Sequence, residues 1–234
     1  MTLPVLYSLR NCPYAMRARL AIYKSKQAVE LRDLVLKDKP PEMIAASPKA
    51  TVPILVLSSS KESASKVIDE SLDIMLWALG ESDPNNLLRA EILNSPVSSS
   101  ETKPLIKLAD IRSLVDLFDH EFIPCLDAYK CAKRYHESNL QECREACEVY
   151  IQNLEQRLSS HEYLIDDKES MVDIALLPFI RKFAKVERQW YQQSPYPKVR
   201  RWLNLYLQSA MFNKVMAKYP LWSSGQSVIE FGDI

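Results

Sequence analysis

The chain has 234 residues, with 30 basic and 30 acidic side chains that cancel to a net charge of zero, and 47% of its residues are hydrophobic. This length allows one or two domains with a buried core. Balanced charge argues against a dedicated nucleic-acid-binding protein, because binding to phosphates needs clustered cations. The sequence holds only 3 glycines, so neither a GxGxxG nor a GxxxxGK phosphate-binding loop can be formed.

The N-terminus and the cysteines indicate the compartment. The opening segment MTLPVLYSLR lacks the basic and apolar regions of a signal peptide, and no long apolar run follows. We therefore expect no membrane span. Five cysteines, an odd number, predict free thiols and a cytoplasmic protein. No CxxC or HxxxH pair occurs, so we also expect no metal site.

The first part of the chain alternates short apolar runs with helical patterns. Strands are predicted over residues 3–8, 29–36, 52–57 and 67–68. Helices are predicted to begin at Pro13, at Pro41 and at Ser71, the last ending at Gly80. This order predicts a compact α/β domain.

The second part of the chain shows helical periodicity only. Residues 83–102 contain Asp, Pro, Asn and Ser clusters typical of a linker. Helices are then predicted over 105–122, in one long stretch over 126–160, and over 170–187 and 197–216. The predicted organisation is a first domain over 1–82, a linker over 83–102 and an all-helical domain over 103–234.

Cys12 is the main candidate for chemistry. It lies between the first strand and the first helix, with Pro13 at the first helical position. The free N–H groups of Tyr14 and Ala15 and the helix dipole would favour a thiolate over a thiol there, and nearby arginines would add to this effect. The alternative is a small buried residue at the end of a strand.

Three further motifs have a functional and a purely structural interpretation. Pro53 opens the third strand, and the Val52–Pro53 bond is either cis or that of an ordinary strand-opening proline. The residues 69–71, Asp-Glu-Ser, precede a helix and form either a simple cap or an anion site. Ser170 and Asp173 have the spacing of a capping box, which is structural.

Four segments together resemble the N-terminal thioredoxin-like domain of the cytosolic glutathione transferase superfamily: NCPYAMRARLAI, KP at 39–40, SPKATVPIL and DESLDI. The segments DPNN and SMVDIALLP extend the resemblance into an all-helical second domain. The implied fold class is therefore an α/β thioredoxin-like domain followed by an all-α domain.

The residues around Cys12 indicate a class within this superfamily. The sequence Cys-Pro-aromatic-Ala is similar to the omega class, whose nucleophile is cysteine, and to the large glutaredoxin with a transferase fold, which carries CPYC. The chain departs from CPYC because Ala15 replaces the second cysteine. It departs from the wider superfamily at Ala50, where glycine is usual.

The resemblance implies glutathione as the cofactor and a site made of Cys12, Tyr14, Lys39, Val52, Glu70 and Ser71. Cys12 would be the nucleophile, and the backbone of Val52 would pair with the cysteinyl part of glutathione. Glu70 would meet the γ-glutamyl ammonium and Ser71 its carboxylate. Lys39 would lie near the glycyl carboxylate, unless it is an ordinary solvated lysine.

The predicted activity is glutathione-dependent thiol transfer, of the glutaredoxin or dehydroascorbate reductase kind. Cys12 would form a mixed disulfide with glutathione, and a second glutathione would resolve it, because Ala15 has no thiol. The other substrate would be a small-molecule or protein disulfide. Two alternatives remain open: a non-catalytic glutathione-binding regulatory protein, and a transferase that conjugates an electrophile.

Two expectations concern the helical domain and the assembly. The second substrate would contact aromatic residues of the helical domain, the candidates being Phe118, Phe122, Tyr129, Trp190 and Tyr191. The alternative is structural, because aromatic residues at helical spacing usually belong to the core. The family resemblance implies a possible homodimer, and we expect neither a nucleic-acid nor a membrane partner.

Overall fold

The computed structural model describes residues 2–57, 66–89 and 108–232. The chain divides into two compact units, one formed by Met1–Asn85 with Ser209–Ile234 and the other by Asn86–Gln208. The first unit contains a small mixed sheet with helices, and the second contains helices only. The predicted fold class, an α/β domain followed by a helical domain, is confirmed.

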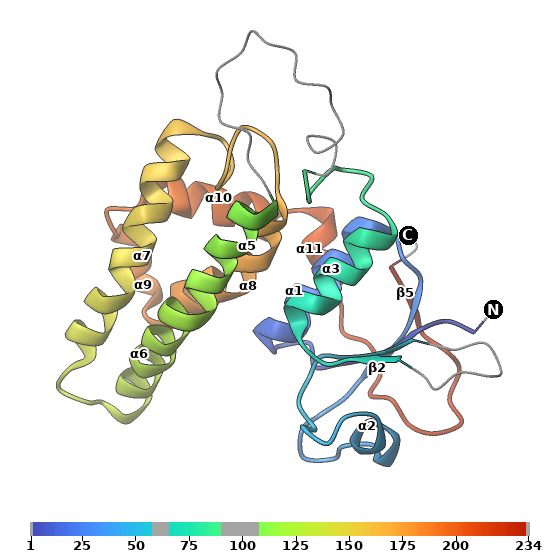
Figure 1. Ribbon diagram of the computed structural model, residues 1–234. Helices are drawn as coiled ribbons and strands as arrows, with labels where there is room; N and C mark the ends of the chain where they lie inside the picture. The colour runs from blue at the N-terminus through green and yellow to red at the C-terminus, as the bar shows by residue number, and fades with distance from the viewer. Residues whose placement is uncertain (1, 58–65, 90–107, 233–234) are drawn as a thin grey trace, which may run out of the picture. The chain divides into compact units, whose positions relative to one another are not determined.

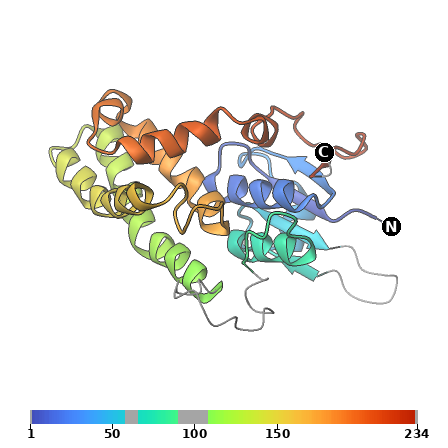
Figure 2. The ribbon, with the colours of Figure 1, turned by 90° about the horizontal axis from the view of Figure 1, so that it is seen from above.

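The first unit follows the predicted order of elements closely. Its elements up to residue 81 are β1 (Val5–Ser8), α1 (Pro13–Ser25), β2 (Val29–Asp33), α2 (Pro41–Ala46), β3 (Ile54–Leu57), β4 (Lys66–Ile68) and α3 (Ser71–Glu81). β1 pairs in parallel with β2 and antiparallel with β3, which pairs antiparallel with β4. Figures 1 and 2 show α1 and α3 side by side on one face of the sheet, and Figure 1 shows α2 on the other face.

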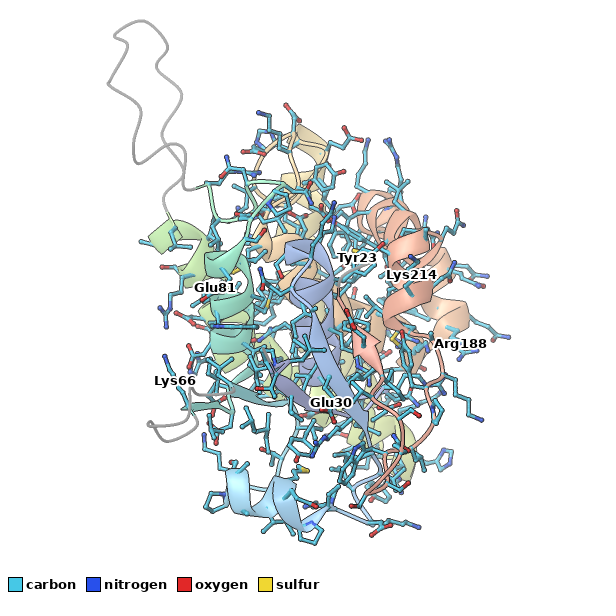
Figure 3. The ribbon with its side chains drawn as sticks, turned by 90° about the vertical axis from the view of Figure 1, so that its right-hand side faces the viewer. Tyr23, Glu30, Lys66, Glu81, Arg188 and Lys214 are labelled. Carbon is cyan, nitrogen blue, oxygen red and sulfur yellow. The ribbon has the colours of Figure 1, made fainter. Side chains whose placement is uncertain are left out.

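A segment from the C-terminal end of the chain completes this sheet. Helix α11 (Ala210–Val215) lies beside α1, and strand β5 (Glu230–Phe231) pairs antiparallel with β2, giving the order β4-β3-β1-β2-β5. In Figure 3, Lys214 marks α11 next to Tyr23 of α1, and Glu30 marks β2. Local sequence patterns group this segment with the helical domain. The structure instead places this segment in the first unit. The β5–β2 pairing joins residues about 200 positions apart, and no local pattern encodes such a pairing.

The C-terminal segment is held against β2 by two contacts and passes close to the chain just after α1. The Trp222 amide donates to the carbonyl of Asp33 at 2.7 Å. The guanidinium of Arg32 stacks on the Trp222 ring, 4.4 Å from its centre. Gly232 has φ of 111°, and a Cβ there would collide with the carbonyl of Gln27. The chain therefore needs glycine where it passes this close to the end of α1.

Arg19 forms a buried polar centre in the first unit. Its side chain is fully buried, and its Nη2 lies 2.6 Å from Oδ1 of Asp33. The guanidinium also donates to Ser8 Oγ at 2.7 Å and to the Val215 carbonyl at 3.4 Å. Burial lowers the pKa of Arg19, and the carboxylate of Asp33 opposes that shift. This one side chain ties α1, β2 and α11 together.

The second unit is all helical. Its elements are α5 (Leu108–Leu117), η1 (Phe118–Phe122), α6 (Ile123–Tyr135), α7 (Leu140–Ser160), α8 (Met171–Val186), α9 (Arg188–Gln193) and α10 (Pro197–Leu207). Segment η1 is a π-helical turn in which the Ile123 amide donates to the Phe118 carbonyl. It ends two residues before Pro124, which has no amide hydrogen for the regular helical bond. No helix in the described ranges is long and apolar enough to cross a membrane.

The prediction of one long helix over residues 126–160 is wrong. The chain breaks between α6 and α7 at His136, whose φ is 56°. The Glu137 amide then donates to the Ala132 carbonyl at 2.9 Å, which closes the end of α6. Apolar spacing continues on both sides of this break, so periodicity alone does not reveal it.

The capping box at the start of α8 is confirmed. The amide and hydroxyl of Ser170 donate to Oδ2 of Asp173 at 2.9 and 2.8 Å. Oδ1 of Asp173 accepts from the Leu164 amide and the Trp202 indole, at 3.0 and 3.1 Å. Burial raises the pKa of Asp173 to about 6. Of the predicted linker, residues 83–89 form turns and coil, and residues 90–102 lie outside the described residues.

Candidate functional site

A cavity of about 480 Å³ opens in the first unit. It is bordered by the start of α1, the loop after β2, the loop before β3, and the turn between β4 and α3. Its lining residues are Cys12, Tyr14, Leu36, Lys39, Ala50, Thr51, Val52, Pro53, Asp69, Glu70 and Ser71. All six predicted site residues are among them. The volume falls in the range of small-ligand sites, about 300–1,000 Å³.

Cys12 occupies the residue position just before α1, with Pro13 as the first helical residue. The side chain is half-buried, and its Sγ donates to the Val52 carbonyl at 3.7 Å. No N–H group of the first turn donates to this sulfur. The structure thus brings the thiol to the helix N-terminus, as expected, but its hydrogen-bond partner is a carbonyl instead of the helix amides.

Val52 and Pro53 form the wall of the cavity opposite α1. The peptide bond between them is cis, which agrees with the first of the two interpretations of this motif. Val52 is buried and packs in an apolar cluster with Tyr7, Ala15 and Ile54, and Cys12 lies against this cluster. The relative positions of thiol and Val52 backbone are therefore fixed by the core beneath them.

Ser71 and the N-terminus of α3 form the anion-attracting side of the cavity. Helix α3 begins at Ser71, as predicted, and the capping position is held by Glu70 without a side-chain cap hydrogen bond, so Ser71 does not cap the helix. The Ser71 hydroxyl accepts instead from Nη1 of the fully buried Arg17, at 3.5 Å. This contact leaves the hydroxyl hydrogen of Ser71 available to a ligand anion. The helix dipole and the buried guanidinium both favour negative charge here.

Lys39, in the loop after β2, and Tyr14, in the first turn of α1, also line the cavity. Lys39 is half-buried, and no hydrogen bond or ion pair joins it to another described residue. Its place in the lining puts a cation at the wall of the cavity. Tyr14 is 38% exposed at the start of α1.

The two acidic residues of the cavity lining, Asp69 and Glu70, are paired with a lysine that the sequence analysis missed. Nζ of Lys49 lies 2.7 Å from Oε1 of Glu70 and 3.2 Å from Oδ1 of Asp69. The Ser47 hydroxyl donates to the other oxygen of Asp69 at 2.7 Å. This hydrogen bond, followed by that of Lys49, lowers the pKa of Asp69. Only the sequence proximity of Lys49 to the Thr-Val-Pro segment could have drawn attention to it.

The aromatic candidates for a second substrate belong to the core of the helical unit. Phe118, Phe122, Tyr129 and Tyr191 are buried, and only Trp190 is half-exposed. Phe118 and Phe122 pack with ring centres 5.1 Å apart. The Tyr129 hydroxyl donates to Glu187 at 2.9 Å. These contacts support the structural interpretation of the four buried rings.

A further cavity of about 330 Å³ lies in the helical unit. Its lining includes side chains of both charge signs, such as Lys198, Arg201 and Asp167, most of them exposed, and no cysteine. It contains none of the predicted site residues. The described ranges also hold no cluster of His, Cys, Asp and Glu able to bind a metal ion.

Two family models match the sequence and together span most of it. Residues 6–86 match the model of the glutathione S-transferase N-terminal domain, and residues 100–209 match that of the glutathione S-transferase C-terminal domain. The chain belongs to the glutathione S-transferase family. A search of curated proteins found no match.

Solved structures of glutathione transferases have the same fold. A family member from Pseudomonas fluorescens, solved with two glutathione molecules, is 15% identical with a TM-score of 0.73, and the match covers 92% of each chain. Transferase URE2P6 from Phanerochaete chrysosporium, solved with oxidized glutathione, is 18% identical with a TM-score of 0.71, covering 92% of this chain and 94% of that one. A serine-to-cysteine variant of poplar glutathione transferase F1 is 17% identical with a TM-score of 0.69, covering 92% and 97%. The family is established, and the omega-like class remains a prediction.

Proposed function

We propose that this glutathione S-transferase binds glutathione in the cavity of its first unit and transfers thiols through Cys12. The single observation that carries the proposal is the convergence of six predicted residues, from four separate segments, on one cavity of about 480 Å³. The bound glutathione of the structural relatives supports the choice of ligand.

The charges of the cavity match those of glutathione, which has two carboxylates and one ammonium. Lys39 receives the glycyl carboxylate, and Glu70 receives the γ-glutamyl ammonium. The Ser71 hydroxyl and the N-terminus of α3 receive the γ-glutamyl carboxylate, with Arg17 behind Ser71 at 3.5 Å. The backbone of Val52 pairs with the cysteinyl residue and sets the ligand sulfur beside Cys12.

The reaction proceeds in two exchanges. The Cys12 thiolate attacks the glutathione sulfur of a mixed disulfide, a new sulfur–sulfur bond forms, and the other thiolate leaves and takes up a proton. A second glutathione thiolate then attacks the same glutathione sulfur. Oxidized glutathione leaves, and the Cys12 thiolate is restored. No second thiol of the chain is needed, which agrees with Ala15 in place of a cysteine.

Conjugation of an electrophile is the second candidate, and one contact favours it. The Cys12 thiol donates a hydrogen bond, at 3.7 Å, to the Val52 carbonyl. A thiol that remains protonated could instead donate to the sulfur of bound glutathione and stabilise it as the attacking thiolate. Cys12 would then assist the reaction without forming a disulfide.

The two candidates are separated by treating the protein with oxidized glutathione and mapping the adduct by mass spectrometry. Thiol transfer predicts one glutathione on Cys12 and a disulfide-exchange activity that the Cys12→Ser variant loses. The matched control is Cys131→Ser, because Cys131 is an exposed thiol on α6. It should keep both the adduct and the activity.

Three outcomes would count against thiol transfer. An adduct that survives in Cys12→Ser would locate the reactive thiol elsewhere. Conjugation activity that exceeds thiol transfer and persists in Cys12→Ser at a reduced rate would favour the second candidate. Glutathione binding without either activity would favour a regulatory protein.

The narrower expectations follow from the same proposal. The Cys-Pro-Tyr-Ala sequence at 12–15 supports an omega-like class. Five free cysteines suit a reducing compartment such as the cytoplasm. The proposed homodimer is tested by light scattering coupled to size-exclusion chromatography.

A further inference from the structure

Lys49 forms ion pairs with Asp69 and Glu70, the two acidic residues that line the cavity. Its Nζ lies 2.7 Å from Glu70 Oε1 and 3.2 Å from Asp69 Oδ1, and both acids line the cavity. Lys49 itself is not among the lining residues. It therefore reaches the two carboxylates from outside the cavity, across its rim.

The loop that carries Lys49 is fixed in place. The Ser47 hydroxyl donates to Asp69 Oδ2 at 2.7 Å, and the Ala50 amide donates to the Ser47 carbonyl at 2.9 Å. Ala50 adopts φ of 49°, which turns the chain back toward β3. The same carboxylate, Asp69, thus anchors the loop through Ser47 and holds the ammonium of Lys49.

This inference rests on the proposed function, in which Glu70 meets the ammonium of the γ-glutamyl group. In the free protein one oxygen of Glu70 already has an ammonium at hydrogen-bond distance. Two ammonium groups on one carboxylate repel each other. A ligand amine must therefore either share Glu70 with Lys49 or displace the Lys49 ammonium, which then stays on Asp69.

We propose that Lys49 is a specificity-determining residue that supplies Glu70 with a cation from the chain, so that the site accepts glutathione-like thiols whose α-amine is absent or acylated. Without a ligand amine, Glu70 keeps Lys49 as its partner. In a chain without Lys49, the cation opposite Glu70 would have to come from the ligand amine. Such a chain would bind ligands without a free α-amine more weakly than ligands that have one.

The electrostatics of the three groups agree with this role. The hydrogen bonds from Lys49 to Glu70 and then to Asp69 raise the pKa of Lys49, so it is charged at neutral pH. The lowered pKa of Asp69 keeps that carboxylate ionised and able to hold Lys49 when a ligand amine occupies Glu70. Because the Lys49 and Glu70 side chains are 53% and 65% exposed, the effect on affinity is modest.

The test is a cycle of two ligands and two proteins, measured by isothermal titration calorimetry. The ligands are S-methylglutathione, which cannot form a disulfide, and the same compound with the α-amine replaced by hydrogen. The proteins are the natural chain and Lys49→Met. The quantity compared is the Kd of the amine-free ligand divided by the Kd of S-methylglutathione.

We expect this ratio to be about two- to five-fold larger in Lys49→Met than in the natural chain, which corresponds to an exposed ion pair. Lys49→Arg, which keeps the cation, should restore the natural ratio. Lys66→Met is the matched charge control, because Lys66 is an exposed lysine on the edge strand β4 outside the cavity lining (Figure 3). It should leave the ratio unchanged.

Three results would overturn the inference in distinguishable ways. Tight binding of S-methylglutathione with equal ratios in the natural chain and Lys49→Met would refute the role of Lys49 and leave the proposed function intact. Absence of S-methylglutathione binding to the natural chain would refute the proposed function and this inference together. A larger ratio in Lys66→Met as well would show a general charge effect and also refute it.

Discussion

Replacing Asp33 by Asn tests the buried polar centre that joins the C-terminal helix α11 to α1 and β2 within the first unit. The Arg19 guanidinium is fully buried, and its charged partner is the Asp33 carboxylate at 2.6 Å. Removing one partner of a buried ion pair costs about 3–5 kcal/mol. The amide oxygen of Asn can still accept one hydrogen bond, so we expect about 3 kcal/mol, at the lower end of that range. This is a large part of a typical unfolding free energy of about 5–15 kcal/mol.

The measurement is urea unfolding followed by far-ultraviolet circular dichroism. With a urea m-value of about 1–3 kcal/mol per molar, the loss should lower the unfolding midpoint by about 1–3 M. Asp38→Asn is the control, because Asp38 is exposed and substitutions at such positions change stability by less than about 0.5 kcal/mol. An Asp33→Asn midpoint within the error of the Asp38→Asn midpoint would refute the assignment of Arg19 and Asp33 as a stabilising centre.

Three further predictions concern the loops of the cavity. Ser47→Ala should lower the unfolding free energy by about 1 kcal/mol at pH 7, and the difference should shrink as the pH falls toward 2–3. The reason is that the hydrogen bond from Ser47 lowers the pKa of Asp69 in the folded state. The stabilisation from this hydrogen bond is therefore complete above the pKa of Asp69 in the unfolded state, and it is lost as the pH falls through the folded-state pKa. A difference that does not depend on pH would contradict this reasoning. Ala50→Val should cost about 1–2 kcal/mol in thermal or urea unfolding, because a branched side chain is crowded at φ of 49°; Ala50→Gly should show no loss, and an equal loss in both would contradict the strain argument. Lys39→Met should weaken glutathione binding about two- to five-fold by calorimetry, whereas an unchanged Kd would mean that Lys39 does not contact the ligand.

Local signals in the sequence were sufficient for most of the fold. Pro13 at the first position of α1 and the capping box of Ser170 with Asp173 predicted two helix starts correctly. The break at His136 was missed, because a single residue in the left-handed conformation ends α6 without interrupting the apolar spacing. Strand β5 was missed for a different reason. It is only two residues long, and its partner β2 lies at the other end of the chain.

The candidate site was predictable where a residue type is tied to a motif. Cys12 before proline and Ser71 at a helix start are signals of this kind, and both line the cavity. Lys49 carries no such signal, because its importance arises only when folding brings the loop before β3 against the turn before α3. The partner of the Cys12 thiol was likewise beyond prediction, since it depends on a carbonyl 40 positions away.

The pairing of β5 with β2 has a consequence for biosynthesis. Ribosomes deliver the chain from the N-terminus, and early domains commonly fold while later ones are still being made. The first unit here includes Ser209–Ile234, and β5 of this segment pairs with β2, so synthesis must pass residue 231 before the sheet is complete. A nascent chain paused after α3 would present the bare edge of β2 to chaperones or to neighbouring nascent chains.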